Sequence, residues 1–329
     1  MNGQFEGKRV LLVDSGDEKA SPHAPLRRRA LERLGCSVRL CDLAEKQGLL
    51  ARWRSRKPAD RLTRLIDEMV PDVVLVIDAA ELTGAMVQQV RRQSGARWAN
   101  WFMGGVRSLP LMEAVGSAYD TLFVPGTDCA HQLTVPGRPP SHYLPPACDP
   151  SVHRPMTARD TFRANVVFVG RSTPRREQLL SELVEFGLAV WGAEWRKTGL
   201  RDYCRGDRLD GADYVRAYAG ASVAVNIHDE PQGEGGTSSG CNQRTFELAS
   251  IGAAQVVDDR ADLARHFVAG QELLVYRSGA ELKELVQRLM HDRPEAERLS
   301  QASRRRAMAE HTYMHRMAEL LGTVLKREV

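Results

Sequence analysis

An arginine at the start of a predicted helix is the feature of the sequence that points most directly to chemistry. A glycine-rich loop, 228–241, leads into a helix that carries Arg244 in its first turn. Helix N-termini bear partial positive charge and unpaired backbone N–H groups, so an arginine there is unfavourable unless an anion compensates it. Arg244, with Asn242 and Thr245 beside it, therefore predicts a phosphate site. The alternative is an ordinary surface pair between Arg244 and Glu247.

Glu247 and a second arginine group extend this prediction to a nucleotide. Glu247 follows Arg244 by one helical turn, where a carboxylate could accept both hydroxyls of a ribose. Gly170 and Arg171 follow a predicted strand, and Arg175 begins the next helix. Glycine allows close approach of a ligand to the backbone, and arginine offers a fork of donors to a diphosphate. The alternative is a strand-to-helix turn with surface arginines.

Catalytic candidates are fewer and less specific. Asp14, Asp78 and Asp128 lie at or near predicted strand ends that would face a cleft, a position that suits a general base, although aspartate also caps helices there. His228 is a further catalytic candidate, but a lone loop histidine is more often structural. Trp191 could stack on a base or sugar, or it could belong to the core.

The composition indicates a soluble two-domain protein. With 329 residues, 43% hydrophobic and 27% charged, the chain is expected to form two domains of about 150 residues each. No apolar run approaches the roughly 20 residues that span a bilayer, and the first residues do not form a signal peptide. Six cysteines without CxxC spacing indicate reduced thiols and a cytoplasmic location. The histidines show no metal-ligand spacing, so no metal site is predicted.

The net charge of +4 is mild and comes partly from arginine runs in the first half of the chain. These runs are Arg27–Arg29, Arg52–Lys57 and Arg91-Arg92. Such runs are usually solvated helix faces. The sharper interpretation is an anionic acceptor or peripheral association with a membrane surface through these helices, and no stable nucleic-acid partner is expected.

Two α/β units separated by a proline-rich linker are predicted from the hydrophobic pattern. Apolar runs near 10–13, 38–41, 72–78, 98–102 and 121–124 alternate with helical patterns, then 136–155 reads as an extended linker, and the alternation restarts at 165. Continuous apolar strands between amphipathic helices predict parallel sheets covered on both faces. Open parallel sheets bind ligands beyond the carboxyl ends of their strands.

The motif Asn242-x-Arg244-x-Phe246-Glu247, continued by Gly252 and Asp258-Asp259, resembles the CgeB-like glycosyltransferases. The stretch 143–150 and the ending from Ala309 to Arg316 are also similar to that family. The resemblance implies a GT-B architecture, with two facing Rossmann-like domains, parallel sheets and a cleft between them. It implies an acceptor-binding domain over 1–145, a donor-binding domain over 146–315, and a C-terminal helix over 316–329 that packs back toward the first domain.

The resemblance also implies roles for individual residues. Gly170 and Arg171 would hold the diphosphate, Arg244 and Asn242 would complete the phosphate site, and Glu247 would bind the ribose. Ser239 stands where related enzymes often carry a glutamate that contacts the donor sugar. The expected activity is metal-independent transfer of a sugar from a nucleotide-diphosphate sugar to an acceptor hydroxyl, with no cofactor. A nucleotide-sugar epimerase and a catalytically silent nucleotide-sugar binding protein are the alternatives.

Overall fold

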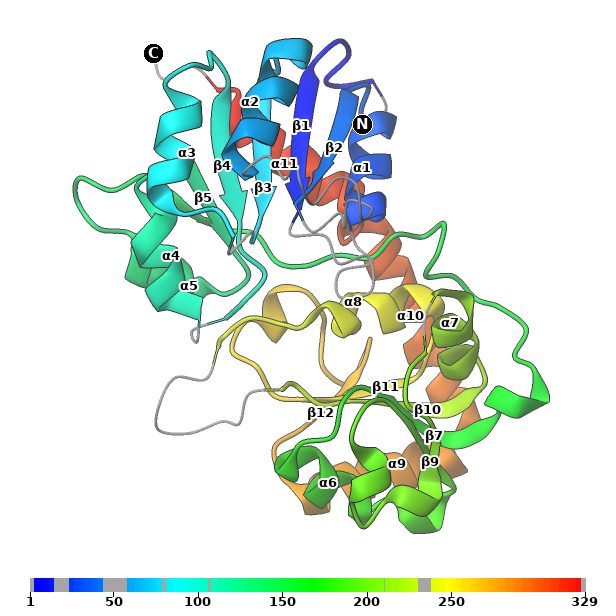
Figure 1. The fold of residues 1–329 in the computed structure, drawn as a ribbon. Helices are drawn as coiled ribbons and strands as arrows, with labels where there is room; N and C mark the ends of the chain where they lie inside the picture. Colours follow the sequence, from blue (N-terminus) through cyan, green and yellow to red (C-terminus); the bar gives the residue numbers. More distant parts are fainter. Residues whose placement is uncertain are drawn as a thin grey trace, which may run out of the picture. The chain divides into compact units, whose positions relative to one another are not determined.

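The chain forms two compact units (Figure 1). The computed structural model describes residues 3–14, 24–43, 58–78, 81–105, 108–209, 211–229 and 238–326. Unit 1 comprises Met1–Pro145, Ser238–Gly240 and Tyr313–Val329, and unit 2 comprises Pro146–Thr237 and Cys241–Thr312. The Arg52–Lys57 run and most of the predicted glycine-rich loop lie outside the described residues.

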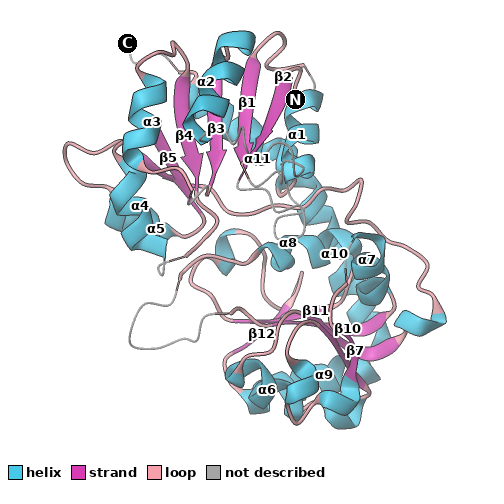
Figure 2. Ribbon diagram, viewed as in Figure 1, coloured by secondary structure: helices cyan, strands magenta, loops and turns pink. Residues whose placement is uncertain are grey.

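The sheet of unit 1 has six parallel strands in the order β2-β1-β3-β4-β5-β6. Figure 2 labels the part of this sheet from β2 to β5. Its strands are β1 (Arg9–Asp14), β2 (Ser37–Asp42), β3 (Val73–Ile77), β4 (Arg97–Trp101), β5 (Thr121–Val124) and β6 (Ser141–Tyr143). Every residue of β3 and β5 is buried, as expected for strands whose two faces are both covered.

The sheet of unit 2 also has six parallel strands, in the order β12-β11-β10-β7-β8-β9. Its strands are β7 (Ala164–Val169), β8 (Leu188–Trp191), β9 (Cys204–Gly206), β10 (Ala221–Asn226), β11 (Gln255–Asp258) and β12 (Leu274–Tyr276). The predicted parallel sheets are therefore confirmed in both units.

Each sheet contains one point at which the chain reverses the direction in which it adds strands. In unit 1 the reversal falls between β1 and β3, and in unit 2 between β7 and β10. At such a point the loops after the two neighbouring strands diverge and leave a crevice at their carboxyl ends, where open α/β sheets bind ligands. The two reversals therefore indicate where each unit can bind a ligand.

Eleven labelled α-helices connect and cover the strands among the described residues. Unit 1 contains α1 (Ala24–Arg33), α2 (Pro58–Met69), α3 (Gly84–Arg91), α4 (Leu109–Gly116), α5 (Thr127–Leu133) and α11 (Tyr313–Val324). Unit 2 contains α6 (Pro174–Ser181), α7 (Gly211–Ala219), α8 (Gln243–Ile251), α9 (Gly279–His291) and α10 (Arg293–Glu310). No helix in the described ranges is long and apolar enough to cross a membrane.

Three features of the elements differ from what the sequence pattern predicts. The proline-rich stretch 136–155 is not only a linker, because it contains β6, which pairs with β5. Between β11 and β12, where the alternation of strands and helices predicts a helix, the chain forms only a single 3₁₀ turn, Leu263–Arg265. The pattern also failed to predict α10, whose buried positions Leu299, Ser303 and Ala307 include only one large apolar side chain.

The C-terminal helix α11 belongs to unit 1 and begins at Tyr313, three residues before its expected start. Its apolar residues Met317, Leu320, Leu321 and Val324 are buried. At its first turn, the guanidinium carbon of Arg27 in α1 lies 5.5 Å from the ring centre of Tyr313 and 5.2 Å from that of Trp101 in β4. The helix is thus built into the core of unit 1 around a buried cation.

Candidate functional site

The reversal point of unit 2 gathers the charged residues at the carboxyl ends of three adjacent strands. Gly170 and Arg171 follow β7, His228 and Asp229 follow β10, and Asp258 ends β11. The first turns of α6 and α8 are bound to the same strand ends by the contacts described below. All of these residues belong to unit 2.

The turn after β7 is fixed by the end of β8. The Gly170 N–H donates to the Trp191 carbonyl at 2.8 Å, and the Trp195 indole N–H donates to the Gly170 carbonyl at 2.7 Å. Gly192 has a φ of 140°, and a Cβ at that position would lie 2.1 Å from the Gly170 oxygen. Glycine is therefore required where the two turns approach each other.

Two arginine side chains, those of Arg176 and Arg244, lie against the ring of Phe168 close to Gly170. The guanidinium carbons of Arg176 and Arg244 each lie 5.3 Å from the Phe168 ring centre. A Cβ at Gly170 would lie 3.2 Å from Arg244 Nη2, so the glycine leaves space beside this guanidinium. Within the described part of the chain, neither Arg176 Nε nor Arg244 Nε has a hydrogen-bond partner, and both atoms are buried.

Arg176, which follows Arg175 in the first turn of α6, is a buried arginine with 6% of its side chain exposed. Its Nη1 donates to the Arg171 carbonyl at 3.1 Å and its Nη2 to the Ile227 carbonyl at 3.0 Å. Burial and then the positive charge of Arg244 lower the pKa of Arg176 to about 10. After burial, the charges of Arg244 and Arg171 lower this pKa and Asp229 opposes them, as expected where several arginines lie close together.

Arg171 and Arg175 form ion pairs with carboxylates at the carboxyl ends of the unit 2 strands. The Arg171 side chain, 62% exposed, donates to Asp229 Oδ2 at 2.8 Å, and Arg176 Nη1 lies 3.2 Å from the other oxygen of Asp229. Arg175 donates to Asp258 Oδ2 at 3.0 Å and to the His228 carbonyl at 3.2 Å. A diphosphate here would therefore compete with Asp229 for Arg171.

Asn242 and Thr245 hold the first turn of α8. Asn242 is the N-cap, and its Oδ1 accepts from the Thr245 N–H at 3.0 Å and from the Thr245 hydroxyl at 3.1 Å. Its amide also exchanges hydrogen bonds with buried Asn226, which reaches Gln255. Helix capping uses the polar atoms of both side chains in this structure, and their role as donor ligands stays a prediction.

Glu247 lies beside Arg244 on α8, but its side chain is 8% exposed and its carboxylate has several protein partners. The Tyr214 hydroxyl donates to Oε2 at 2.6 Å, Gln243 Nε2 donates to Oε1 at 2.9 Å, and His153 Nε2 lies 3.4 Å from Oε1. Burial and the Glu247 charge raise the pKa of Tyr214 well above its ordinary value, so the phenol stays protonated and donates. Tyr214, Gln243 and His153 gave no signal in the sequence.

His228 is a poor candidate for a catalytic base because both ring nitrogens are engaged. Its Nε2 accepts from the Asn242 N–H at 2.8 Å, and its Nδ1 lies 2.6 Å from Asp258 Oδ1. Burial lowers the pKa of His228, although Asp258 opposes that shift. The ring is therefore part of the scaffold that holds α8.

Trp191 belongs to the core of unit 2. The side chain is 2% exposed and packs with Phe162, whose ring centre lies 6.4 Å away, while the guanidinium carbon of Arg205 lies 5.6 Å from the indole centre. No large face of this indole is exposed for stacking on a base or sugar. The core interpretation of Trp191 therefore replaces the stacking one.

The two aspartates proposed as bases flank the reversal point of unit 1. Asp14 ends β1, is 2% exposed and lies 3.6 Å from the buried guanidinium of Arg27. Asp78 follows β3, is partly exposed and adopts a left-handed φ of 52°, with Oδ1 accepting from the Met103 N–H at 2.8 Å. Burial raises the pKa of Asp78, and Arg27 opposes the shift. Of the two side chains, that of Asp78 is the more exposed.

Asp128, the third aspartate, has a different role. Ser239 of unit 1 donates its N–H and its hydroxyl to the two oxygens of Asp128, both at 2.8 Å. The Asp128 N–H donates back to Ser239 Oγ at 3.1 Å. Gly240 fits only because it has no side chain, since a Cβ there would lie 2.3 Å from the Pro125 oxygen. Asp128 therefore anchors the Ser238–Gly240 segment.

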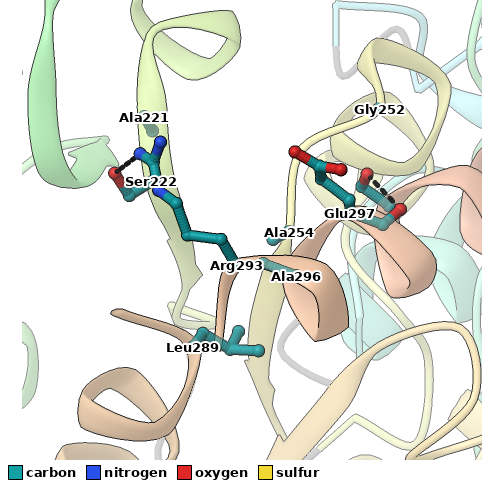
Figure 3. A pocket seen from close by; sticks show the side chains of 9 residues that line it. Ala221, Ser222, Gly252, Ala254, Leu289, Arg293, Ala296 and Glu297 are labelled. Carbon is teal, nitrogen blue, oxygen red and sulfur yellow. Dashed lines mark hydrogen bonds between the residues drawn. The ribbon is translucent and has the colours of Figure 1, made fainter. Parts of the chain in front are cut away.

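A small cavity of about 190 Å³ lies at the opposite end of the unit 2 strands (Figure 3). It is lined by residues including Ala221 at the amino end of β10, and Arg293 reaches Ser222 across it at 3.4 Å. It is therefore separate from the arginine group at the carboxyl ends. The residues that the structure describes contain no group of three or more His, Cys, Asp or Glu side chains that could hold a metal ion.

Comparison with known proteins identifies the fold. Residues 175–322 match the glycosyl transferase-like family. No curated protein sequence matches the chain significantly. The structure is similar to sucrose-phosphate synthase from Thermosynechococcus elongatus, with a TM-score of 0.68, 13% identity and coverage of 96% of this chain and 98% of that one.

Two further solved structures agree. A glycosyltransferase from Rickettsia africae has a TM-score of 0.67 at 9% identity, over 98% of this chain and 100% of that one. HepE from Anabaena, in complex with UDP and glucose, has a TM-score of 0.64 at 12% identity, over 96% and 100%. The chain therefore has the GT-B fold of these glycosyltransferases and carries a glycosyl transferase-like domain over residues 175–322.

Proposed function

We propose that the protein is a GT-B glycosyltransferase that moves a sugar from a nucleoside-diphosphate sugar to an acceptor hydroxyl. The observation that carries the proposal is the group of Arg171, Arg176 and Arg244 around Gly170 at the reversal point of unit 2. Their positive charge suits a diphosphate. The UDP and UDP-glucose in the HepE structures support a nucleotide sugar as donor, and the motif around Arg244 and Glu247 supports a CgeB-like subfamily.

Chemistry at this site follows from the charge that develops on the leaving diphosphate. Preorganised cations stabilise that charge more in the transition state than in the bound donor. Arg244 is placed for this role because its guanidinium lies beside Gly170. Tyr218, Tyr214 and Glu247 raise the pKa of Arg244 despite its burial, so the cation persists at any physiological pH.

Glu247 is the proposed ribose ligand. In the structure Gln243 Nε2 donates to Glu247 Oε1, whereas Tyr214 holds Oε2. Gln243 is only half-buried, so a ribose hydroxyl can replace its amide while Tyr214 keeps the carboxylate in place. The nucleoside would then pair with a carboxylate already oriented by the protein.

Asp78 of unit 1 is the proposed group that receives the acceptor proton if transfer inverts the sugar. It is partly exposed, whereas Asp14 is buried against Arg27. Asp78→Asn should then reduce kcat by about 10²-fold or more and leave the Kd for UDP unchanged. Equal loss in Asp14→Asn and Asp78→Asn would instead indicate a fold role for both.

The test of the proposed function begins with nucleotide binding. Thermal melting of the protein with UDP, dTDP, GDP and their sugars should identify a ligand, since a ligand at 100 times its Kd stabilises the protein by about 2.7 kcal/mol.

Arg244→Ala should weaken the binding of that ligand by about 1.5–3 kcal/mol, the range for a hydrogen bond to a charged group. Arg196→Ala is the matched control, because Arg196 is exposed and pairs only with Asp207 among the contacts described for it. An unchanged affinity for the nucleotide in Arg244→Ala would contradict the proposed position of the diphosphate beside Arg244.

We propose that transfer needs no bound metal or cofactor, because arginines supply positive charge where the diphosphate would lie. Turnover should continue in excess EDTA. Loss of turnover that Mg²⁺ or Mn²⁺ restores would overturn this part of the proposal, while nucleotide binding without metal would still stand.

A nucleotide-sugar binding protein without turnover is the second candidate. The observation that favours it is Ser239, whose hydroxyl is held by Asp128. A serine held in this way cannot replace the sugar-contacting glutamate that resembling enzymes often carry. This candidate predicts binding of a nucleotide sugar that is never consumed with any acceptor, whereas a transferase consumes it.

A cytoplasmic location and peripheral membrane association remain part of the proposal. Membrane contact cannot use Arg27, which is buried, and would depend on exposed residues such as Arg28, which already pairs with Glu32 at 2.7 Å. Flotation with anionic vesicles tests it: wild-type protein that stays with the soluble fraction at low salt has no such association.

A further inference from the structure

His228 and Asp258 form a buried pair at the start of α8 that the proposed chemistry does not use. Asp258 Oδ1 accepts from the His228 backbone N–H at 3.0 Å and lies 2.6 Å from His228 Nδ1. Its other oxygen accepts from Arg175 at 3.0 Å and from Arg260 at 3.1 Å. The side chains of His228 and Asp258 are 7% and 2% exposed. The pair is thus enclosed by protein and ties the ends of β10 and β11 together.

The hydrogen bonds fix the protonation state of this ring. The Asn242 backbone N–H can only donate, so His228 Nε2, 2.8 Å away, must be an acceptor. The remaining proton of the neutral ring is then on Nδ1, where it donates to Asp258. If the ring were protonated on both nitrogens, the Nε2–H group of His228 and the backbone N–H of Asn242 would be two donors facing each other. Only the neutral ring with its proton on Nδ1 satisfies every contact.

Asn242 is the N-cap of α8, so its backbone position sets where the helix begins. Arg244 follows two residues later. Its guanidinium lies beside Gly170, and a small shift in the first turn would displace it from the turn after β7. The acceptor nitrogen of His228 therefore acts on Arg244 through the helix start.

We propose that His228 is a positioning residue for the donor site: held by Asp258, it accepts the Asn242 N–H and fixes the first turn of α8, and with it Arg244. The inference rests on the proposed function for its ligand, a nucleoside diphosphate. It assigns to His228 no proton transfer and no contact with the reacting atoms.

Two substitutions at His228 separate the two sides of the ring. His228→Gln places an amide oxygen near the Nε2 position, so it keeps an acceptor for Asn242 and loses the bond to Asp258. His228→Asn places an amide nitrogen near the Nδ1 position, so it keeps the donor to Asp258 and loses the acceptor. The chain thus offers a matched pair in which only one variant preserves the helix contact.

The measurements are the Kd for UDP by calorimetry and the hydrogen-exchange rate of the Asn242 amide without nucleotide. We expect His228→Asn to raise the Kd about tenfold and to speed exchange, because a buried donor loses its partner. His228→Gln should change the Kd by less than about threefold and keep exchange slow. Nitrogen NMR of the wild-type imidazole should show the proton on Nδ1 and needs no variant, so it stands even if a variant fails to fold.

Three results would overturn the inference: equal Kd values in the two variants, a proton on Nε2 in the wild type, or loss of turnover in both variants with the UDP affinity unchanged. The last result would make His228 a group that acts on the reacting atoms. If wild-type protein binds none of UDP, dTDP and GDP, the proposed function fails, and the exchange rates and imidazole spectrum alone then decide whether His228 holds α8.

Discussion

The Glu247 carboxylate shows how much a single residue depends on partners that come from other elements. Its neighbour Arg244 follows from the sequence through helical spacing, but Tyr214, Gln243 and His153 surround it as well. Two of these three partners lie on segments far away in the chain. Spacing within one helix predicts neighbours on that helix, and it carries no information about side chains that arrive from elsewhere.

Glu247→Gln provides a test at this scale. The amide oxygen can still accept from Tyr214, so the fold should survive, but a neutral amide is a weaker acceptor for two ribose hydroxyls. We expect the affinity for UDP to fall by about 1.5–3 kcal/mol while the affinity for free pyrophosphate stays nearly constant. Calorimetry with both ligands measures this. Equal weakening of UDP and pyrophosphate binding in Glu247→Gln would show that the residue serves the phosphate site or the fold.

Acid should destabilise the protein through His228. Burial lowers the pKa of this ring below its ordinary 6.5, with Arg260 and Arg244 adding to the shift and Asp258 opposing it. A histidine with a lowered folded pKa binds its proton first in the unfolded chain. The free energy of unfolding should therefore begin to fall as the pH drops below about 6.5 and should level off below the folded pKa.

Urea unfolding of wild type and His228→Gln between pH 8 and 5 isolates this effect. The difference in stability between the two proteins should shrink as the pH falls, because only the wild type carries the ring. Arg175, which donates to the His228 carbonyl and to Asp258, is unchanged in both proteins. A constant difference across this range would show that the ring does not titrate on unfolding.

At the scale of elements, the start of α8 is the structure on which the donor site depends. The sequence predicted this helix and the position of Arg244 in its first turn. The glycine-rich loop and Asn242 come before the helix, and apolar residues recur with helical spacing within it. It did not predict that Asn242 caps the helix and is held by other segments. The acceptors for its two N–H donors are Asn226, in β10, and His228, which follows β10. Parallel strands bring those groups together only once the sheet has formed.

Asn242→Ala should therefore destabilise unit 2 more than an ordinary cap loss. Removing a cap costs about 1–2 kcal/mol, and the buried Asn226 amide would lose partners as well. Asn242→Asp is the matched comparison, because its carboxylate still accepts from Thr245. Urea unfolding should place Asn242→Asp between wild type and Asn242→Ala. An alanine variant as stable as the wild type would contradict the capping role.

Two of the elements that the pattern failed to predict, α10 and β9, share one property. Neither α10 nor β9 presents a regular run of large apolar side chains: α10 buries Ser303 and Ala307 beside Leu299, and β9 is only three residues long. Periodicity detects elements by what they bury, so elements that bury small side chains escape it.

At the scale of the whole molecule, the C-terminal helix belongs to unit 1 although unit 2 precedes it in the chain. Its buried face includes Leu320, with no exposed surface, whereas its neighbour Glu319 points to solvent. Leu320→Ala should cost about 2–5 kcal/mol in stability, the range for a buried leucine. Glu319→Ala should change stability by less than about 0.5 kcal/mol. Thermal melting compares the two, and a Leu320→Ala variant that melts with the wild type would make α11 a dispensable tail.

The placement of α11 also sets an order of events on the ribosome. Because a nascent chain emerges from its N-terminus, all of unit 2 is synthesised before the residue that packs beside Arg27, Tyr313, has been added. Unit 1 thus starts first and is completed last, so a released chain that ends at Thr312 should hold a protease-resistant unit 2 and an unfinished unit 1. During that interval the surface that α11 will cover is open to chaperones, and the buried cation has only one of its two aromatic neighbours.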